Sequence, residues 1–328
     1  MKKPLFLVSL ALTLAGFAAL VAAPAAAAEG VRHGLSVCAG VIIPSLLPFL
    51  ILSSLLTALE LPRLLAKAAG PLMGRLFAVP GAAAAPLLLG LTGGYPVGAA
   101  ATAELVRRGE LSPEEGGRVL AFCNNTGPAF ILGAAGSGVF GSARFGMLLY
   151  LSHILAAVAV GVLLRFSAKK KDRTFHAARR SETPPAFRSL PEALPECVKG
   201  AVAAVLNICG FVTLFSAVTA LLDARGWFSG AAGFLAARTG AELRFVRALL
   251  TGILELGGGI GVMSGLSPAP QNLALASFLL GFGGLSVHCQ TLSVVAGAEL
   301  GTARHFLGRL LHGALSAGIT FLLCILGQ

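Results

Sequence analysis

The segment Phe122-Cys123-Asn124-Asn125-Thr126-Gly127-Pro128 places two amides and a hydroxyl inside an apolar stretch, with no charged residue anywhere in 119–143. Asn124 or Thr126 is suited to cap a helix that begins at the proline, because proline fits the first turn of a helix. The free N–H groups of such a helix start favour a carboxylate or another electron-rich group. A capped loop at the membrane surface is the alternative, but it would not need apolar flanks on both sides. We interpret Asn124, Asn125 and Thr126 as substrate-binding residues.

The composition places this segment in a membrane protein. Of the 328 residues, 56% are hydrophobic and 12% are charged, whereas a soluble domain carries about 25% charged residues. So few charges leave much of the surface to lipid. The apolar runs are long and lack the alternation of barrel strands, and in lipid each backbone polar group needs an internal partner. The sequence therefore predicts an all-α, multi-pass integral membrane protein.

The net charge of +11 is concentrated in one stretch of the chain. Nine of the 25 Lys and Arg residues lie between Arg165 and Lys199, together with four carboxylates. Nucleic-acid binding would need basic residues interleaved with aromatics on a folded face, so no nucleic-acid partner is expected. The stretch 166–198 is instead typical of a cytoplasmic loop under the positive-inside bias.

An internal repeat organises the rest of the chain, because four landmarks recur in the same order at a nearly constant offset. The matched residues are Glu60 with Asp223, Gly90 with Gly252, Phe122 with Phe282, and His153 with His312. The two repeats are predicted at 34–165 and 199–328, on either side of the basic loop.

Helices are predicted near 34–59, 62–78, 82–105, 116–140 and 144–165, and again near 199–222, 228–239, 243–266, 270–298 and 303–326. We expect the polar-tipped segments 116–140 and 270–298 to be re-entrant. Each repeat then crosses the membrane three times, which inverts the second repeat and puts Arg107 and Arg108 outside. Two inverted-topology repeats with broken helices and re-entrant hairpins form the architecture of many secondary transporters.

The first 28 residues have two interpretations. Lys2 and Lys3 precede an apolar run, and Ala-rich sequence follows it. This pattern fits a signal peptide with a small-residue cleavage site and equally a retained transmembrane segment or signal anchor. We favour the retained segment, because the rest of the chain is a membrane protein.

Two breaks in apolar runs occupy matching places in the repeats. Gly93-Gly94-Tyr95-Pro96 interrupts the first repeat, because proline removes a donor and glycine lowers helix propensity. Gly257-Gly258-Gly259 is its counterpart. Close helix packing through small residues is the alternative. Unwound backbone at membrane depth is tolerated only against protein or a water-filled cavity, so we interpret the paired breaks as parts of a site that includes Tyr95.

Two further features suit ligand chemistry. Ser286, His288 and Gln290 alternate after Gly283-Gly284, and in an extended segment they share one side; a packing histidine is the alternative for His288. Glu255 is the only carboxylate between Ala248 and Ala298. An ionisable residue in such a segment is expensive, which favours a function in ion or proton coupling over a purely structural pairing.

Enzyme motifs are missing from the sequence. It holds no Gly-Lys-Ser/Thr phosphate loop and no paired-histidine zinc motif, and its six cysteines lack metal-ligand spacing. No catalytic residue, metal or cofactor is therefore expected, and we do not expect an enzyme.

Four motifs together resemble the YlbJ-type sporulation integral membrane proteins. They are 43–49 (Ile-Pro-Ser-Leu-Leu-Pro-Phe), 93–99 (Gly-Gly-Tyr-Pro-Val-Gly-Ala), 122–128 and 284–290. That family carries the nucleoside-recognition or gate domain, related to concentrative nucleoside transporters. The resemblance implies an all-helical carrier in the membrane around the forespore, a role in the spore cortex, and dipicolinate as cargo. Related carriers use polar hairpin tips and a membrane-embedded glutamate, positions that Asn124, Asn125, Thr126, Ser286, Gln290 and Glu255 occupy here. The chain offers few ribose or base partners, which argues against a nucleoside more than against a transporter.

The residues and the resemblance together favour a secondary carrier or facilitator of a small polar aromatic or anionic solute, coupled to H+ or Na+ or uncoupled. A non-transporting scaffold or gate subunit of a sporulation complex is the alternative. The expected partners are the solute and the bilayer, and a homo-oligomer is an arrangement that the sequence leaves open.

Overall fold

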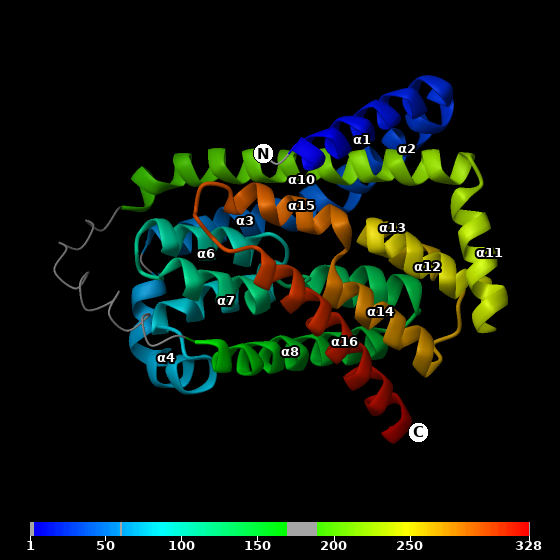
Figure 1. The fold of residues 1–328 in the computed structure, drawn as a ribbon. Coiled ribbons are helices and arrows are strands. Elements are labelled where there is room, and N and C mark those ends of the chain that lie inside the picture. The colour runs from blue at the N-terminus through cyan, green and yellow to red at the C-terminus, as the bar shows by residue number, and fades with distance from the viewer. Residues whose placement is uncertain (1–2, 60, 169–188, 328) are drawn as a thin grey trace.

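The computed structural model describes residues 3–59, 61–168 and 189–327, which contain helices and no β-strand (Figure 1). Four segments are long and apolar enough to cross a membrane. They are α8 (Ala143–Leu164) with its extension η4 (Arg165–Ser167), α10 (Leu190–Ala224), the broken pair α14 (Pro270–Phe282) and α15 (Gly284–Val295), and α16 (Ala303–Leu326). Two bent helix pairs, 6–22 with 24–40 and 64–77 with 81–93, would bring the number to six if each pair counted as one span. The predicted all-α membrane fold is confirmed.

One order of elements occurs twice along the chain. The first series is α2 (Pro24–Val37), η1 (Cys38–Ile42), α3 (Ile43–Ala58), α4 (Leu61–Phe77), η2 (Gly81–Ala83), α5 (Ala84–Gly93), α6 (Val97–Arg107), α7 (Pro113–Cys123), η3 (Ala129–Val139) and α8. The second series is α10, α11 (Trp227–Thr239), α12 (Leu243–Leu254), α13 (Leu256–Val262), α14, α15 and α16. Each series therefore runs as a long helix, a shorter helix, two helices joined by a tip, a broken helix and a final long helix. Figure 1 shows α10 along one face, α8 along the other, and the broken elements between them.

The long first helices of the two series pack antiparallel along their length. A Cβ at Gly30 would lie 2.7 Å from the Ala217 Cα, and one at Gly34 would lie 2.7 Å from the Thr213 Cα. Further along, the Cys38 thiol contacts the carbonyl of Cys209 at 3.8 Å. Partner numbers fall as residue numbers rise, so α2, η1 and α3 run against α10. Two mirrored copies of one unit produce such a pairing when their first helices meet at the pseudo-twofold axis.

The re-entrant hairpins are α5–α6 and α12–α13, not the segments predicted from their polar tips. Within α5–α6, Gly90 faces Gly98, and a Cβ on Gly98 would lie 3.1 Å from the Gly90 Cα. Within α12–α13, a Cβ on Gly259 would lie 2.6 Å from the Gly252 nitrogen. Two helices that touch through glycines on both sides of a tip have reversed direction. The prediction failed because a break in an apolar run has the same local sequence pattern whether the chain continues in its direction or turns back.

The segments that carry the polar tips are broken spans. The helix α7 begins with a capping box, in which the Ser112 N–H donates to Glu115 at 2.9 Å and the Glu115 N–H donates back to the Ser112 hydroxyl at 3.2 Å. It ends at Cys123, and η3 begins at Ala129, after the five residues 124–128. The helix α14 stops at Gly283, whose φ of +91° favours glycine, and α15 follows at once. Together α14 and α15 cross the bundle as one bent span.

Because α5–α6 turns back, Arg107 and Arg108 return to the side from which α5 started. Both line a hollow with Gly200 and Ala204, in the first half of α10. Their predicted place on the side opposite the basic loop is therefore wrong. Of the loop 166–198, residues 169–188 lie outside the described residues, and the helix α10 already begins at Leu190.

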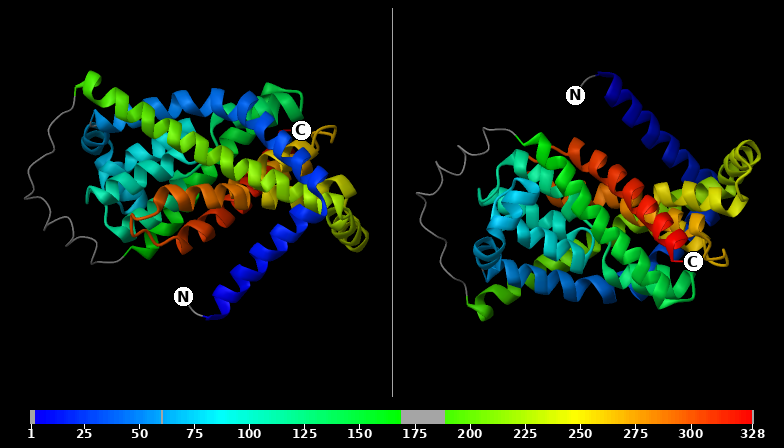
Figure 2. Two further views of the ribbon diagram at one scale, coloured as in Figure 1. Left: turned by 90° about the horizontal axis from the view of Figure 1, so that it is seen from above. Right: turned by 90° about the horizontal axis from the view of Figure 1, so that it is seen from below.

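The N-terminal segment is a helix that stands apart from the bundle. The helix α1 (Lys3–Ala22) is bent by 102° from α2 and projects outward from the bundle (Figure 2). Its apolar side chains, such as Leu12 and Phe17, are exposed. Residues Lys2 and Glu60, named in the sequence interpretation, lie outside the described residues. The first repeat's long helix reaches back to Pro24, ahead of the predicted start at residue 34.

We expect Gly259→Ala to destabilise the α12–α13 hairpin, because its Cβ would collide with backbone atoms of α12 that cannot move aside. Overpacking of this kind costs about 1–3 kcal/mol. The matched control is Gly261→Ala on the same short helix, where nothing lies within 4 Å of the added methyl. Thermal unfolding in detergent measures both variants. Equal midpoints for the two would contradict the close hairpin packing.

Candidate functional site

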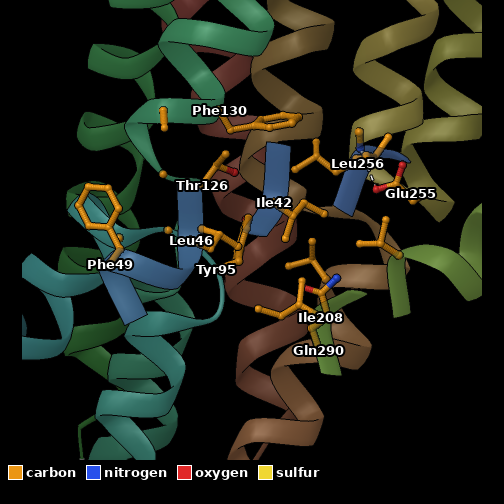
Figure 3. Close-up of a pocket in the computed structure, with 18 of the residues that line it drawn as sticks. Ile42, Leu46, Phe49, Tyr95, Thr126, Phe130, Ile208, Glu255, Leu256 and Gln290 are labelled. Atoms are coloured by element: carbon orange, nitrogen blue, oxygen red, sulfur yellow. Dashed lines mark hydrogen bonds between the residues drawn. The ribbon is translucent and has the colours of Figure 1, made fainter. Parts of the chain in front are cut away.

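A cavity of about 120 Å³ lies between the tips of the two hairpins (Figure 3). One tip contributes Gly93, Gly94 and Tyr95, and the other contributes Glu255, Leu256 and Gly257. The broken spans contribute Thr126, Gly127, Phe130, Val287 and Gln290, and apolar side chains of α2, η1, α3 and α10 close the remaining side. A water needs only about 10–15 Å³ of such space, so the cavity is large enough for more than one water.

The tips and the breaks hold one another in place around this cavity. A Cβ on Gly94 would lie 2.7 Å from the Gly127 nitrogen, so the first hairpin tip rests on the break after α7. Likewise, a Cβ on Gly284 would lie 2.6 Å from the Gly252 carbonyl oxygen, so the second hairpin rests on the break between α14 and α15. The unwound backbone is therefore packed against protein and a cavity rather than lipid, which is the condition for tolerating it at membrane depth.

Three neutral polar side chains lie at the cavity wall, and each is held by a hydrogen bond. Thr126 Oγ1 donates to the Leu280 carbonyl at 2.7 Å, and Tyr95 Oη donates to the same carbonyl at 3.2 Å. Gln290 Nε2 donates to Ser286 Oγ at 3.2 Å. A glutamine that uses one donor in this way retains a second N–H and a carbonyl acceptor for a solute. The wall therefore has few polar groups, and they are oriented before a solute binds.

Glu255 forms the tip of the second hairpin. Its carboxylate accepts from the Gly257 N–H at 2.9 Å and the Gly258 N–H at 2.5 Å, so it caps α13. The predicted break at Gly257–Gly259 is thus displaced: the chain breaks at Glu255, and the glycines lie inside α13. Each carboxylate oxygen keeps acceptor capacity beyond the cap, and Glu255 lines the cavity. The cap and a role toward a solute or cation are therefore compatible.

Of the predicted segment 124–126, only Thr126 reaches the cavity. Asn124 Nδ2 donates to Thr291 Oγ1 of α15 at 2.8 Å, which ties the two broken spans together. Asn125 Nδ2 donates to the Phe122 carbonyl at 3.0 Å, which satisfies the end of α7. Neither Asn124 nor Thr126 caps η3, because Pro128 precedes η3 without a side-chain cap. The asparagines therefore support the wall from behind.

The predicted alternation of Ser286, His288 and Gln290 on one side is wrong, because α15 is helical there. On a helix, residues four apart share a face and a residue two positions away points elsewhere. Ser286 and Gln290 accordingly bond to each other. His288 Nδ1 lies 3.1 Å from His305 Nε2, with its ring beside Phe282 and Phe306 and away from the cavity lining. In an apolar run the sequence offers no periodicity that separates a short helix from a strand.

Arg309, which sequence reasoning missed, lies directly behind Tyr95. It is fully buried in α16, donates to Tyr95 Oη and to the Gly281 carbonyl, and stacks its guanidinium 5.2 Å from the Tyr95 ring centre. It also donates to His312 Nδ1 at 2.8 Å and to Asn125 Oδ1 at 3.5 Å. A single guanidinium thus contacts the first hairpin tip, both broken spans and α16. Five fixed donors make arginine suited to such a node.

A sequence signal for this node did exist. The residues His305, Arg309, His312, Ser316 and Thr320 of α16 recur at steps of three and four, and all five are buried. A polar stripe at helical spacing inside an apolar span indicates a face turned toward the protein interior.

Fold and site together define a transporter-like integral membrane protein. Two re-entrant hairpins and two broken spans converge on one cavity, which is the arrangement in which secondary transporters place their substrate sites.

Comparisons with known proteins specify the family. A family model described as "Gate: Nucleoside recognition" matches residues 39–142, which hold the first hairpin and the whole of the first broken span. Over 332 residues the chain is 31% identical to the sporulation integral membrane protein YlbJ of Bacillus subtilis (strain 168), covering 93% of this chain and 79% of that protein. The chain belongs to the YlbJ family of sporulation integral membrane proteins, and the resemblance seen in the sequence is confirmed. No solved structure matches it.

We expect Arg309→Gln to destabilise the protein strongly. The substitution leaves the Gly281 carbonyl and the Tyr95 hydroxyl without their buried donor, and each such loss costs roughly 1–3 kcal/mol. The control is Arg304→Gln one turn away, where the exposed side chain donates to the Glu114 carbonyl at 3.4 Å. Thermal unfolding in detergent should show a large drop for the first variant and little change for the second. A similar drop in unfolding temperature for both variants would contradict the special contribution of Arg309 to the packing of the hairpin and the broken spans.

Proposed function

We propose that this protein is a membrane carrier of a small polar aromatic or anionic solute that acts in bacterial sporulation, in the membrane around the forespore. The observation that supports the proposal best is the cavity at which both hairpin tips and both broken spans meet. A scaffold needs no hollow at this place, whereas a carrier needs a central site that elements from both sides can close.

The lining favours a flat solute with a polar edge. Phe49, Phe130, Leu46 and Ile208 offer apolar walls, and Tyr95, Thr126, Gln290 and Glu255 supply the polar groups (Figure 3). A mostly apolar pocket with a few placed polar groups is typical of small-molecule sites. Dipicolinate and a nucleoside both have this form. The relative's name points to sporulation and the family description to nucleosides.

Glu255 is proposed as the group that distinguishes these cargoes and couples them to an ion. A dicarboxylate beside an ionised Glu255 meets like-charge repulsion, so it needs a proton or Na+ bound at this acid. A nucleoside instead offers hydroxyl and amide donors that a carboxylate accepts. The proposed contacts to the solute are Tyr95, Thr126 and Gln290, while Asn124, Asn125, Ser286 and His288 act through the elements they hold together.

We expect proteoliposomes with purified protein to take up dipicolinate or uridine, and Gln290→Leu to reduce the uptake about tenfold or more through loss of a buried hydrogen-bonding partner. Glu255→Gln should weaken uridine uptake if a nucleoside is the cargo. For dipicolinate it should weaken the dependence on H+ or Na+ while uptake down the solute gradient remains. Radiolabelled flux measures each case.

The matched control is Glu242→Gln, an exposed acid just before α12 that should leave flux unchanged. Folded wild-type protein that moves neither probe at any ion gradient would contradict the carrier. That outcome would favour the scaffold or gate subunit of a sporulation complex, and co-purification of a partner from sporulating cells would then be the decisive measurement.

A further inference from the structure

Two imidazoles that the repeat places at matching positions are stacked at the centre of the bundle. His153 of α8 and His312 of α16 are both completely buried, with ring centres 4.3 Å apart and planes tilted by 39°. They lie outside the cavity lining, but His153 is bonded to the lining residue Thr126, and His312 is bonded to Arg309, which in turn donates to the lining residue Tyr95. Histidine is the side chain whose charge changes most readily near neutral pH. The hydrogen bonds of this pair therefore determine which contacts are lost when one of the rings takes up a proton.

The hydrogen bonds fix the proton of each neutral ring. His153 Nε2 accepts from the Thr126 backbone N–H at 3.2 Å, so its own proton is on Nδ1. His312 Nδ1 accepts from Arg309 at 2.8 Å, because a guanidinium only donates, so its proton is on Nε2, which donates to the His153 carbonyl at 2.9 Å. Both basic lone pairs are therefore occupied by N–H donors.

Adding a proton to this pair must break one of those bonds. A proton on His153 Nε2 removes the acceptor of the Thr126 N–H, and Thr126 is a cavity residue. A proton on His312 Nδ1 turns this nitrogen into a donor that faces the Arg309 N–H donor, so the bond between Arg309 and His312 is lost. Neither change is possible without rearranging the break at 124–128 or the Arg309 node.

The charges around the pair are positive. Arg309 is the charged side chain that acts on both rings, and it also acts on Tyr95, Cys123, His288 and His305. Ser152 of α8 and the Ser277–Ser316 pair of α14 and α16 are neutral neighbours along the same helices. In the described part of the chain, no carboxylate lies within ion-pair distance of Arg309, His153 or His312.

We propose that the His153–His312 pair is a proton-binding site, distinct from Glu255, whose protonation releases Thr126 and opens the cavity wall at the break after α7. This inference rests on the proposed carrier function, because the site has a role in transport only if H+ is a coupling ion of the carrier. The absence of a counter-charge for Arg309 opposes protonation in the closed state. An anionic solute beside Tyr95 offsets that charge, so anion and proton favour each other's binding, and the coupling is reciprocal.

The first test needs no transport. Hydrogen exchange of the peptide containing residues 124–128 is measured by mass spectrometry in nanodiscs with saturating dipicolinate and corrected for intrinsic exchange; it should accelerate roughly tenfold in wild type as the pH falls from about 8 to about 5, and much less when dipicolinate is left out. His153→Gln retains a side-chain acceptor for the Thr126 N–H and takes up no proton, so its exchange should stay slow at all pH values. His305→Gln, a buried imidazole of α16 remote from Thr126, should follow wild type.

The second test joins the site to transport. An inward acid gradient should drive dipicolinate uptake into wild-type proteoliposomes, while His153→Gln should retain downhill uptake and lose the acceleration by the gradient. Wild-type exchange that is independent of pH, or that His153→Gln leaves pH-dependent, overturns the proton site whatever the flux. Absence of flux in wild type, with the pH-dependent exchange present, overturns the carrier and leaves the proton site standing.

Discussion

The structure depends on one constraint, which is that backbone interrupted at membrane depth must find its partners inside the protein. Arg309 supplies hydrogen-bond donors to several of these interrupted segments from one side chain. Its guanidinium bonds the Tyr95 hydroxyl and the Gly281 carbonyl, and so joins the tip of the first hairpin to the end of α14. A buried cation without a carboxylate partner is costly on its own. Here carbonyl, phenol, amide and imidazole acceptors share the charge instead.

The same logic explains why the interruptions occur together. A single break in one helix would expose unpaired groups, whereas four breaks that meet can satisfy one another. Asn124 bridges to Thr291 across the two broken spans, and Thr126 reaches the Leu280 carbonyl at the end of α14. Glycines make this contact close enough, because Gly94 lies on Gly127 and Gly284 lies on the Gly252 carbonyl. The cavity is the space left between the interruptions. The residues that line it are therefore also residues that stabilise the fold.

This sharing has a consequence for how such a protein works. The cavity residues Tyr95, Thr126 and Glu255 each hold structural bonds as well as facing the hollow. A change of charge or a bound solute at this place therefore acts directly on the contacts between hairpins and spans. A carrier requires such coupling between the occupancy of its site and the packing of its gates.

The sequence by itself determined the membrane environment, the helical class, the order of elements and the identity of the polar tips, because each of these follows from local composition and spacing. It also singled out Glu255, Tyr95, Thr126 and Gln290, all of which line the cavity. It did not separate them from Asn124, Asn125, Ser286 and His288, which lie outside the cavity lining. Only the tertiary structure decided which interrupted segments turn back, that Arg309 lies behind Tyr95, and that His153 stacks on His312. The physical reason is that an interruption in an apolar run has the same local sequence in either case. The direction of the chain after it is chosen by tertiary contacts, such as those of Gly94 with Gly127 and of Tyr95 with Arg309.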